Sequence, residues 1–335
     1  MFDTNSFQEG LCLEPFIEDG IITNWDYFEK AFDNITQGTV KADMTESPLL
    51  ITEKAYNSQF LRHKMCELAF ERFQVPALFV SKDSVMACYS CGRTSGLVVD
   101  CGASGTNITP VNDGWAESRG LTRSPIGTRI LDEYTYLLSL NRVRPTDDAL
   151  LLPQFRVNKI PLTDVTTLLS QPKTYNVVSW KNVPTSYDRF ATLDLGRAVR
   201  EAVARVAEGS LADLNQRYSN IPTTTYELPD GRVLEYGIER YAVPELYFDP
   251  SALPDEMAGP LLRTQPAETN SSPALAPTPA SSSASMLKSV PRLIVDSIVQ
   301  CDTEIQSALL AGIVLVGGGA CLDGLPERIR VEVSI

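Results

Sequence analysis

The sequence predicts an α/β protein large enough for about two domains. The chain has 335 residues, and domains typically contain about 100–200 residues. Short apolar stretches typical of buried strands, among them ALFV at 77–80, GLVVD at 96–100 and IVLV at 313–316, alternate with segments of helical spacing. Gly-rich turns follow two of these strands. These three observations define the predicted fold class.

The individual elements follow from hydrophobic spacing and from capping and turn residues. Asn24 or Asp26 can cap a first helix that carries aromatic residues inward. Helices are further predicted at 59–73, from Thr128 to about 140, at 196–208 with an end at Gly209, at 291–300, at 303–310 and from Pro326 onward. Strands at 96–100 and 108–111 form one hairpin, and 223–241 forms a second that turns at Asp230 and Gly231.

Two segments lack a sustained period. Residues 141–190 contain several prolines and predict an irregular, loop-rich insertion. Residues 259–288 are rich in Pro, Ser, Ala and Thr with almost no large apolar groups. Such a segment buries too little surface to offset the entropy of ordering it, so a flexible loop is predicted there.

Composition excludes several classes of function. The chain has 29 basic and 42 acidic residues, a net charge of −13, which repels nucleic-acid phosphates. No apolar run is long enough to cross a bilayer, and the first ten residues lack a signal pattern. The seven scattered cysteines suit a reducing compartment. A single histidine, His63, excludes a multi-histidine metal site and argues against a Ser-His-Asp triad.

The first Gly-rich turn, CGASGTN, follows the strand that ends at Asp100. Consecutive backbone N–H groups in such a turn can form an anion nest, and a carboxylate beside it can hold hydrated Mg²⁺ that bridges phosphates. An ordinary hairpin with a polar turn explains the same residues. The turn alone does not decide between these interpretations.

The second Gly-rich turn, GGGA, follows strand 313–316. Three consecutive glycines let a flat ligand lie against the backbone. A strand-to-helix turn that needs positive φ angles is the alternative. Neither turn is a P-loop, because no Gly-Lys-Ser/Thr follows, and GGGA is not a dinucleotide fingerprint.

Both turns occur among motifs that resemble the actin family, and within it the nuclear actin-related proteins of chromatin-remodelling assemblies. The matching stretches cover about half of the chain: IEDGIITNWDYFEK (17–30), SPLLITEKAYN (47–57), KMCELAFERFQVPALFV (64–80), SCGRTSGLVVDCGASGTNITPVNDGW (90–115), SW (179–180), TTTYELPDGRVLEYGIERYAVPELYFDPS (223–251) and DSIVQCDTEIQSALLAGIVLVGGGACLDGLPERI (296–329).

The resemblance implies a two-lobed ATPase fold with ribonuclease H-like subdomains and an incomplete first subdomain. Residues 1–90 would form a partial first lobe. Residues 91–126 and 286–335 would form the core subdomain that carries the nucleotide-binding turns, and 127–285 the remaining subdomain. The family's first phosphate-binding hairpin would precede residue 1, and its C-terminal helices would follow Ile335. We therefore expect either a truncated gene product or a member with half a nucleotide site, in which ATP is held less tightly.

The resemblance further implies a site for ATP or ADP with Mg²⁺, on which the turns at Asp100 and Gly317 would close from opposite walls. Asp100 matches the aspartate that organises the metal through water, and Glu208, at the end of the predicted 196–208 helix, matches a ribose contact. The remaining cofactor-binding residues are implied to be Gly102, Ala103, Ser104, Gly105 and Thr106 in the second phosphate-binding hairpin, and Gly317, Gly318 and Gly319 beside the adenine and ribose.

Three positions depart from the family pattern. Asp83 stands where hydrolysing actins place the glutamine that orients the attacking water, and Ala103 and Asn107 stand where a second aspartate and a histidine are usual. A carboxylate at position 83 would add negative charge near the γ-phosphate, so we expect no catalytic residue and weak or absent hydrolysis. Asp83 also has the residue type of a helix N-cap.

Two functions from different classes follow. The first is a non-catalytic nuclear subunit of a chromatin-remodelling or histone-acetyltransferase complex, which pairs with actin on a scaffold-subunit helix and meets histones, without membrane or sequence-specific nucleic-acid contacts. The alternative is a cytoplasmic, cytoskeletal actin-like ATPase that forms filaments. A sugar kinase of the same nucleotide fold is disfavoured because IITNW and PERI resemble actins specifically.

Overall fold

A computed structural model describes residues 11–143, 151–159, 175–212, 221–264 and 287–334. The chain divides into two compact units. The first, here named the sheet unit, comprises Pro15–Gly127 and Val290–Ala320. The second, named the helical unit, comprises Met1–Glu14, Thr128–Ser289 and Cys321–Ile335. The domain boundaries expected from the sequence are finer than this division and stay a prediction.

The sheet unit is built around strands in the order β13-β5-β6-β7, with β8 also paired to β6. β5 and β6 form the predicted antiparallel hairpin, while β13 joins β5 in parallel. The elements of this sheet and its helices are β5 (Gly96–Cys101), β6 (Thr106–Asn112), β7 (Trp115–Ala116), β8 (Thr122–Ser124), β13 (Ile313–Val316), α3 (Asp83–Ser90), α10 (Val290–Val299), α11 (Thr303–Ala311) and a 3-10 turn (Gly318–Cys321).

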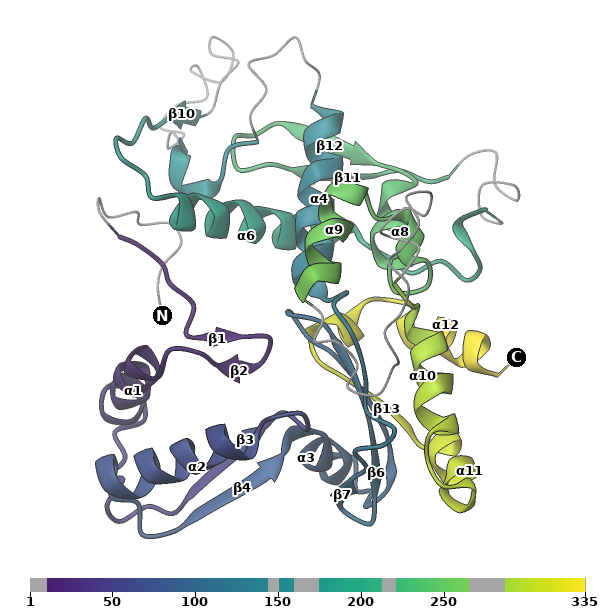
Figure 1. The fold of residues 1–335 in the computed structure, drawn as a ribbon. Coiled ribbons are helices and arrows are strands. Elements are labelled where there is room, and N and C mark those ends of the chain that lie inside the picture. The colour runs from purple at the N-terminus through teal and green to yellow at the C-terminus, as the bar shows by residue number, and fades with distance from the viewer. Residues whose placement is uncertain (1–10, 144–150, 160–174, 213–220, 265–286, 335) are drawn as a thin grey trace, which may run out of the picture. The chain divides into compact units, whose positions relative to one another are not determined.

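Helices cover both faces of this sheet. Val85 and Cys88 of α3 pack against Val98, Val111 and Val314, and α10 and α11 lie on the opposite face (Figure 1). Because both faces are covered, β5 has an almost wholly buried pattern, as the continuous apolar run GLVV predicts. The core therefore fixes the strand ends that carry the Gly-rich turns.

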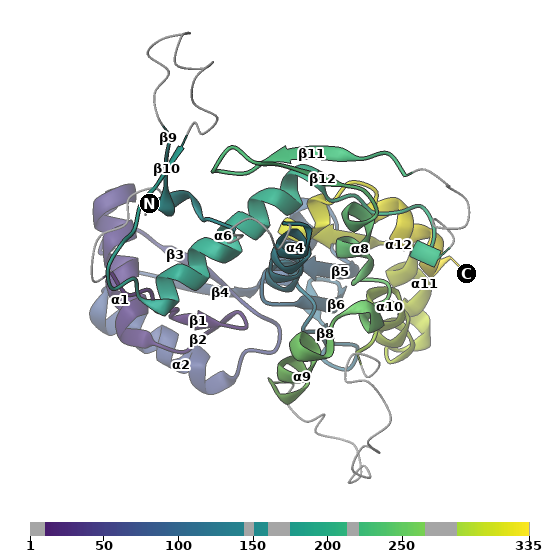
Figure 2. The same cartoon turned by 90° about the horizontal axis from the view of Figure 1, so that it is seen from above.

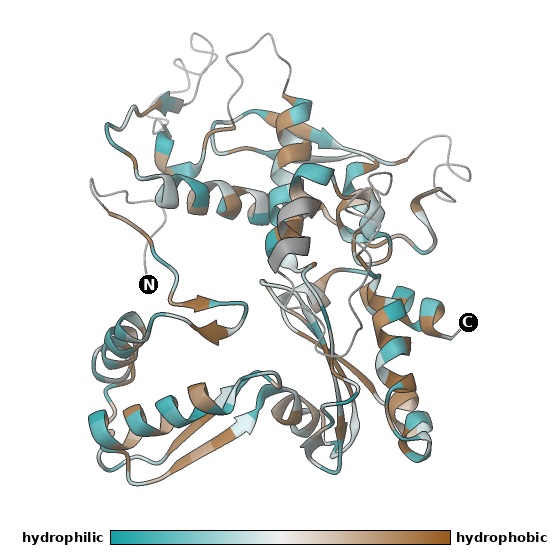
Figure 3. Ribbon diagram, viewed as in Figure 1, coloured by the Kyte–Doolittle hydropathy of each residue, from teal (hydrophilic) through white to brown (hydrophobic). Residues whose placement is uncertain are grey.

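The remainder of the sheet unit contains a second, parallel pair of strands, β3 and β4. Much of this strand pair is apolar (Figure 3). The paired residues Leu50 and Phe79 lie on its exposed face, and Phe73 with Ala69 closes a small core on the other side. The elements here are β1 (Ile17–Glu18), β2 (Ile21–Ile22), α1 (Trp25–Asp33), a π-helix (Asn34–Val40), β3 (Leu49–Glu53), α2 (Gln59–Glu67), a second π-helix (Leu68–Arg72) and β4 (Leu78–Lys82).

The helical unit is organised by the crossing of α4 (Thr128–Arg142) and α6 (Thr185–Val203), seen from above in Figure 2. The helices approach closely at Gly196, where a Cβ would lie 2.3 Å from the carbonyl oxygen of Asp132. Beside this contact Arg200 Nε donates to Asp132 Oδ1 at 2.6 Å, and both side chains are buried. A small residue and a buried ion pair thus set the helix crossing.

The other elements of the helical unit surround this crossing. Val199 and Val203 of α6 pack with Leu228 and Tyr236 of the second predicted hairpin. These elements are a 3-10 turn (Gln154–Arg156), β9 (Val157–Lys159), β10 (Tyr175–Val177), β11 (Thr224–Glu227), β12 (Val233–Tyr236), α8 (Glu239–Glu245), a 3-10 turn (Pro250–Ala252), α9 (Asp255–Thr264) and α12 (Leu325–Val333).

Most predicted elements are confirmed, but the helix expected at 196–208 is wrong at both ends. α6 begins at Thr185, inside the segment expected to be irregular, and it ends at Val203. Ala204 is extended, and the N–H groups of Arg205 and Val206 donate to the carbonyl oxygens of Arg240 and Asp323 rather than to the helix. Tertiary pairing therefore ends the helix before Glu208.

Parts of the two segments expected to be irregular are ordered. In 141–190 the strands β9 and β10 pair antiparallel, and in 259–288 residues 259–264 belong to α9. Residues 144–150, 160–174 and 265–286 lie outside the described residues. Among the helices that the structure describes, none combines the length and apolar character needed to cross a membrane.

Candidate nucleotide site

The two Gly-rich turns meet within the sheet unit, at the same edge of one sheet. Val316 of β13 pairs with Asp100 of β5, so the strands end side by side. Gly317 has a φ of 89°, and a Cβ there would lie 2.6 Å from the carbonyl oxygen of Cys101 and 2.7 Å from Asp100 Oδ1. Only glycine fits this close approach. The turns are therefore neighbours on adjacent strands, not opposite walls of a cleft.

The first turn is tight and partly filled by its own neighbours. The N–H of Gly102 donates to the carbonyl oxygen of Gly105 at 3.0 Å, and a Cβ on Gly105 would lie 2.5 Å from the carbonyl oxygen of Ser124. The buried hydroxyl of Thr106 donates to the carbonyl oxygen of Ile126 at 2.8 Å. Of the cofactor-binding residues expected in this turn, Ala103 and Ser104 are exposed.

The second turn offers an open stretch of backbone. Gly317 and Gly318 are exposed and Gly319 is buried. A Cβ on Gly318 would meet no described atom within 4 Å, so a flat ligand can approach this backbone. Glu208 belongs to the helical unit, where it is exposed and follows the end of α6. Its ribose contact stays a prediction.

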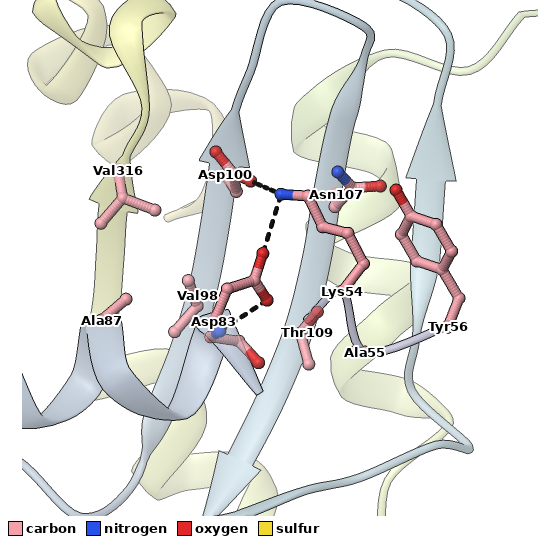
Figure 4. A pocket seen from close by; sticks show the side chains of 11 residues that line it. Lys54, Ala55, Tyr56, Asp83, Ala87, Val98, Asp100, Asn107, Thr109 and Val316 are labelled. Carbon is pink, nitrogen blue, oxygen red and sulfur yellow. Dashed lines mark hydrogen bonds and ion pairs between the residues drawn. The ribbon is translucent and has the colours of Figure 1, made fainter. Parts of the chain in front are cut away.

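A cavity of about 200 Å³ opens beside Asp100. Figure 4 shows its lining, which comes from the loop after β3, from α3 and from β5, β6 and β13. Ligand pockets for drug-sized molecules span about 300–1,000 Å³, so this cavity suits a phosphate-sized group rather than a whole nucleotide. The lining residues are Lys54, Ala55, Tyr56, Asp83, Ser84, Ala87, Val98, Asp100, Asn107, Thr109 and Val316.

The ammonium group of Lys54 lies between two carboxylates of this cavity (Figure 4). Lys54 Nζ is 2.6 Å from Asp100 Oδ2 and 2.8 Å from Asp83 Oδ2. Burial alone would lower the pKa of Lys54, but its hydrogen bonds to Asp100 and Asp83 outweigh burial and raise that pKa. Lys54 is therefore a permanent positive charge at the predicted metal position.

A second ion-pair cluster, centred on Glu53, holds the backbone at Lys54 in place. Lys82 Nζ donates to Glu53 Oε1 at 2.6 Å and to the carbonyl oxygen of Lys54 at 3.3 Å. Arg62 Nε donates to the same Glu53 oxygen at 2.9 Å. Although burial opposes it, hydrogen bonding from Arg62 and Lys82 lowers the pKa of Glu53. The backbone that carries Lys54 is thus tied to β4 and α2.

Tyr56 also lines the cavity, beside Arg123 of β8. The Arg123 guanidinium stacks 3.6 Å from the centre of the Tyr56 ring, and Arg123 Nε donates to Asn107 Oδ1 at 3.1 Å. The Tyr56 hydroxyl donates to the carbonyl oxygen of Asp19 at 2.7 Å, and burial raises the pKa of Tyr56 to about 12. Tyr56 remains neutral and fixed in place at physiological pH.

Asp83 lies at the start of α3, and each of its two carboxylate oxygens has a different partner. It is the first residue of α3, one position inside the N-cap Lys82, so the N-cap interpretation is wrong by one residue. Asp83 Oδ1 accepts the N–H of Ser84 at 2.7 Å while Oδ2 pairs with Lys54. Both oxygens of this carboxylate therefore have protein partners.

Ser84 contributes a buried hydroxyl without a partner. The residue is 4% exposed and lines the cavity, and its Oγ has no hydrogen-bond partner in the part of the chain that the structure describes. Buried polar atoms are nearly always hydrogen-bonded in native proteins. An oxygen atom of a ligand or of water in the cavity would satisfy this hydroxyl.

Comparison with known proteins gives the family of this arrangement. The actin family model matches residues 2–335. The chain therefore belongs to the actin family and has the actin fold, as the motif resemblance implied.

Among individual relatives the chain is similar to actin-related protein 4 of Arabidopsis thaliana. The two are 31% identical over 328 residues, which cover 95% of this chain and 65% of that protein. The actin-related protein 4 sequences of Oryza sativa subspecies indica and japonica are each 29% identical, over 95% of this chain and 64% of theirs. The chain thus spans slightly less than two thirds of the length of these relatives.

The second glycine turn fits the family's nucleotide, whereas the position at Asp100 does not fit directly bound Mg²⁺. The exposed backbone of Gly317 and Gly318 suits the adenine and ribose of a nucleotide. A Mg²⁺ ion bound directly to Asp100 Oδ2 does not fit, because Lys54 Nζ already lies 2.6 Å from that oxygen. Among the described residues, no group of three or more His, Cys, Asp or Glu side chains converges as a metal site.

Sequence analysis identified Asp100, Asp83 and the glycines but not Lys54, Tyr56 or Ser84. Lys54 lies 46 positions from Asp100 in the chain, and no motif marks a lysine at that place. Lys54 does lie within SPLLITEKAYN, directly after a strand that runs parallel to the strand before Asp83. The shared sheet edge of these parallel strands is the signal that brings Lys54 and Asp83 together.

Proposed function

We propose that this protein is a nuclear, non-catalytic actin-related subunit of a chromatin-remodelling or histone-acetyltransferase complex. It binds ATP or ADP as a stabilising ligand rather than as fuel. The observation that carries the non-catalytic part is the position of Lys54 between Asp83 and Asp100. That contact involves Asp100, which was expected to organise a metal, and Asp83, which stands where hydrolysing actins place the water-orienting glutamine.

Hydrolysis needs a group that positions water in line with the γ-phosphate and stabilises the charge that develops. A glutamine amide can both donate and accept a hydrogen bond. Asp83 can only accept, and its two oxygens bind Lys54 and the N–H of Ser84. Position 83 therefore holds no group free to orient the attacking water, which supports weak or absent turnover.

A bound nucleotide contributes to such a subunit without reacting. A ligand that binds only the folded protein raises its stability by mass action. The exposed backbone of Gly317 and Gly318 and the exposed tip at Ala103 and Ser104 offer the contacts. We assign Asp100 no direct or water-mediated metal contact while Lys54 is in place.

The partners follow from the family likeness and from charge. The motifs resemble nuclear actin-related proteins, and the relatives named above carry the name actin-related protein 4. The net charge of −13 favours basic partners and disfavours nucleic acid. We propose actin, a scaffold-subunit helix and basic histone segments as partners.

Affinity purification of the tagged full chain from nuclear extract, followed by mass spectrometry, tests this function. We expect actin together with remodelling or acetyltransferase subunits, and their absence from a mock purification. In parallel, purified protein incubated with ATP should stay in the supernatant at high speed and release phosphate no faster than buffer. ATP-dependent pelleting with phosphate release, and no complex subunits, would instead establish the cytoskeletal alternative.

A further inference from the structure

We propose that the Lys54 ammonium takes the place of the divalent cation at Asp100, so that this site binds a phosphate group without a metal ion. The proposal concerns the same site as the proposed function and rests on its nucleotide. It makes Lys54 a phosphate-binding residue that no family motif assigns.

The first argument is the geometry of Lys54. Its Nζ lies within 2.8 Å of carboxylate oxygens from Asp83 and Asp100, which belong to α3 and β5. Side chains from separate elements thus converge on one positive centre, as ligands converge on a metal. The other oxygen of Asp100, Oδ1, lies beside the backbone of Gly317. A divalent cation would have to displace the ammonium from Oδ2.

The second argument is the supply of hydrogen-bond donors. An ammonium group has three N–H donors, and Asp83 and Asp100 accept two of those of Lys54. The Ser84 hydroxyl, which is buried in the same cavity, has no partner among the described residues. A phosphate oxygen in the cavity can accept from both groups, and the cavity volume of about 200 Å³ admits a group of that size.

The third argument is that Lys54 is held in place. Its backbone carbonyl accepts from Lys82, which also pairs with the nearly buried Glu53. The Gly20 turn packs against its side chain, because a Cβ at Gly20 would lie 2.9 Å from Lys54 Cε. An anchored lysine is a preorganised charge, whereas a surface lysine would first have to be ordered.

The test of the cation uses Mn²⁺ alone, without nucleotide, on the full chain. Electron paramagnetic resonance should detect no bound Mn²⁺ at this site in the wild-type protein. Lys54→Met should create a site for one Mn²⁺, with affinity higher by about tenfold or more because a like charge is removed. Lys54→Arg is the matched control and should still exclude Mn²⁺. Adding Asp100→Asn to Lys54→Met should abolish the new site.

The test of phosphate binding uses the ADP-induced rise in melting temperature. In wild-type protein this rise should be equal in EDTA and in Mg²⁺, whereas in Lys54→Met it should require Mg²⁺. Lys54→Gln is used if Lys54→Met fails to fold, as judged by circular dichroism. Ser84→Ala should reduce the rise in both buffers.

The proposal is overturned if Mn²⁺ binds to the wild type and is lost in Asp100→Asn, or if the ADP-induced rise in the melting temperature of the wild type vanishes in EDTA. An unchanged Mn²⁺ affinity in Lys54→Met also overturns it. If ADP has no effect in either buffer, the nucleotide of the proposed function and the phosphate contact both fail. The Mn²⁺ titration contains no nucleotide, so it still decides whether Lys54 replaces the cation, and copurification still decides the complex.

Discussion

The cavity of the sheet unit and the interior of the helical unit both contain ion pairs, but in different surroundings. Lys54, Asp83 and Asp100 keep 20–32% of their side-chain surface exposed. In the helical unit Arg200 and Asp132 are only 5% and 10% exposed, although they form the same kind of contact at 2.6 Å. The two clusters therefore differ in access to solvent rather than in chemistry.

That difference separates a structural ion pair from one available to ligands. A fully buried pair that loses one partner leaves an uncompensated charge, which costs several kcal/mol. Charges that line a cavity keep access to water and to a ligand, so their removal costs less stability and changes binding more. We expect Arg200 to govern folding and Lys54 to govern ligand recognition.

The largest expected effect is that of Arg200→Ala on stability. Removal of this guanidinium leaves Asp132 buried without its partner, and we expect the free energy of unfolding to fall by about 3–5 kcal/mol, measured by urea denaturation. Arg197→Ala on the same helix is the control, because Arg197 pairs with Asp194 on the surface and should cost about 0.5 kcal/mol or less. Equal losses in the two variants would contradict the assignment.

Gly317→Ala should have the next largest effect. Its φ of 89° and the 2.6 Å approach of the Cys101 carbonyl oxygen lead us to expect a loss of about 1–3 kcal/mol. Gly318→Ala meets no described atom within 4 Å and should change stability by about 0.5 kcal/mol or less. Thermal unfolding compares the two. A smaller ADP-induced rise in melting temperature in Gly318→Ala would place the ligand against this backbone.

Glu245 of the helical unit should make the free energy of unfolding depend on pH. Burial raises the pKa of Glu245 to about 6, although the positive charge of Arg328 acts to lower it. The folded state therefore binds more protons than the unfolded state between the ordinary pKa of 4.5 and about 6, and stability from this group falls as pH rises through that window.

Between pH 4 and 7 we expect the wild type to lose up to about 2 kcal/mol relative to Glu245→Gln. The free energy of unfolding of both proteins is measured with urea at each pH. The difference between the two values cancels the contribution of the other carboxylates. A constant difference across this range would show that Glu245 does not titrate as expected.

Apart from the control variants, the smallest expected stability effect is that of Lys54→Met, about 1 kcal/mol. Asp83 and Asp100 keep solvent access after the change, so neither becomes an isolated buried charge. Guanidinium unfolding measures this value beside that of Arg200→Ala. A loss as large as that of Arg200→Ala would remove the distinction between the two clusters.

Local signals in the sequence predicted the glycine turns correctly, whereas distant contacts determined the rest. The β5–β6 hairpin follows from apolar strands around a short Gly-containing turn, so its residues sufficed to predict it. The end of α6 did not follow from its own residues. The sequence continues with helix-compatible residues to Glu208, but hydrogen bonds from Arg205 and Val206 to distant segments end the helix at Val203.

The candidate site, too, could be predicted only in part from local sequence. Asp100 and Gly317 were predicted because each ends an apolar strand, and motif resemblance gave their order. Lys54 was not predicted, since its role depends on the parallel pairing of β3 with β4, which places it beside Asp83. No residue adjacent to Lys54 in the sequence indicates that contact.

The parallel pairing of β13 with β5 has a consequence during protein synthesis. Leu97 pairs with Ile313, so roughly 200 residues are translated before this edge of β5 receives its partner. At about 5–20 residues per second, that takes roughly 10–40 s. For that time the nascent chain exposes an apolar strand edge, the kind of surface that promotes aggregation and that chaperones bind. The candidate site can form only after its last strand leaves the ribosome.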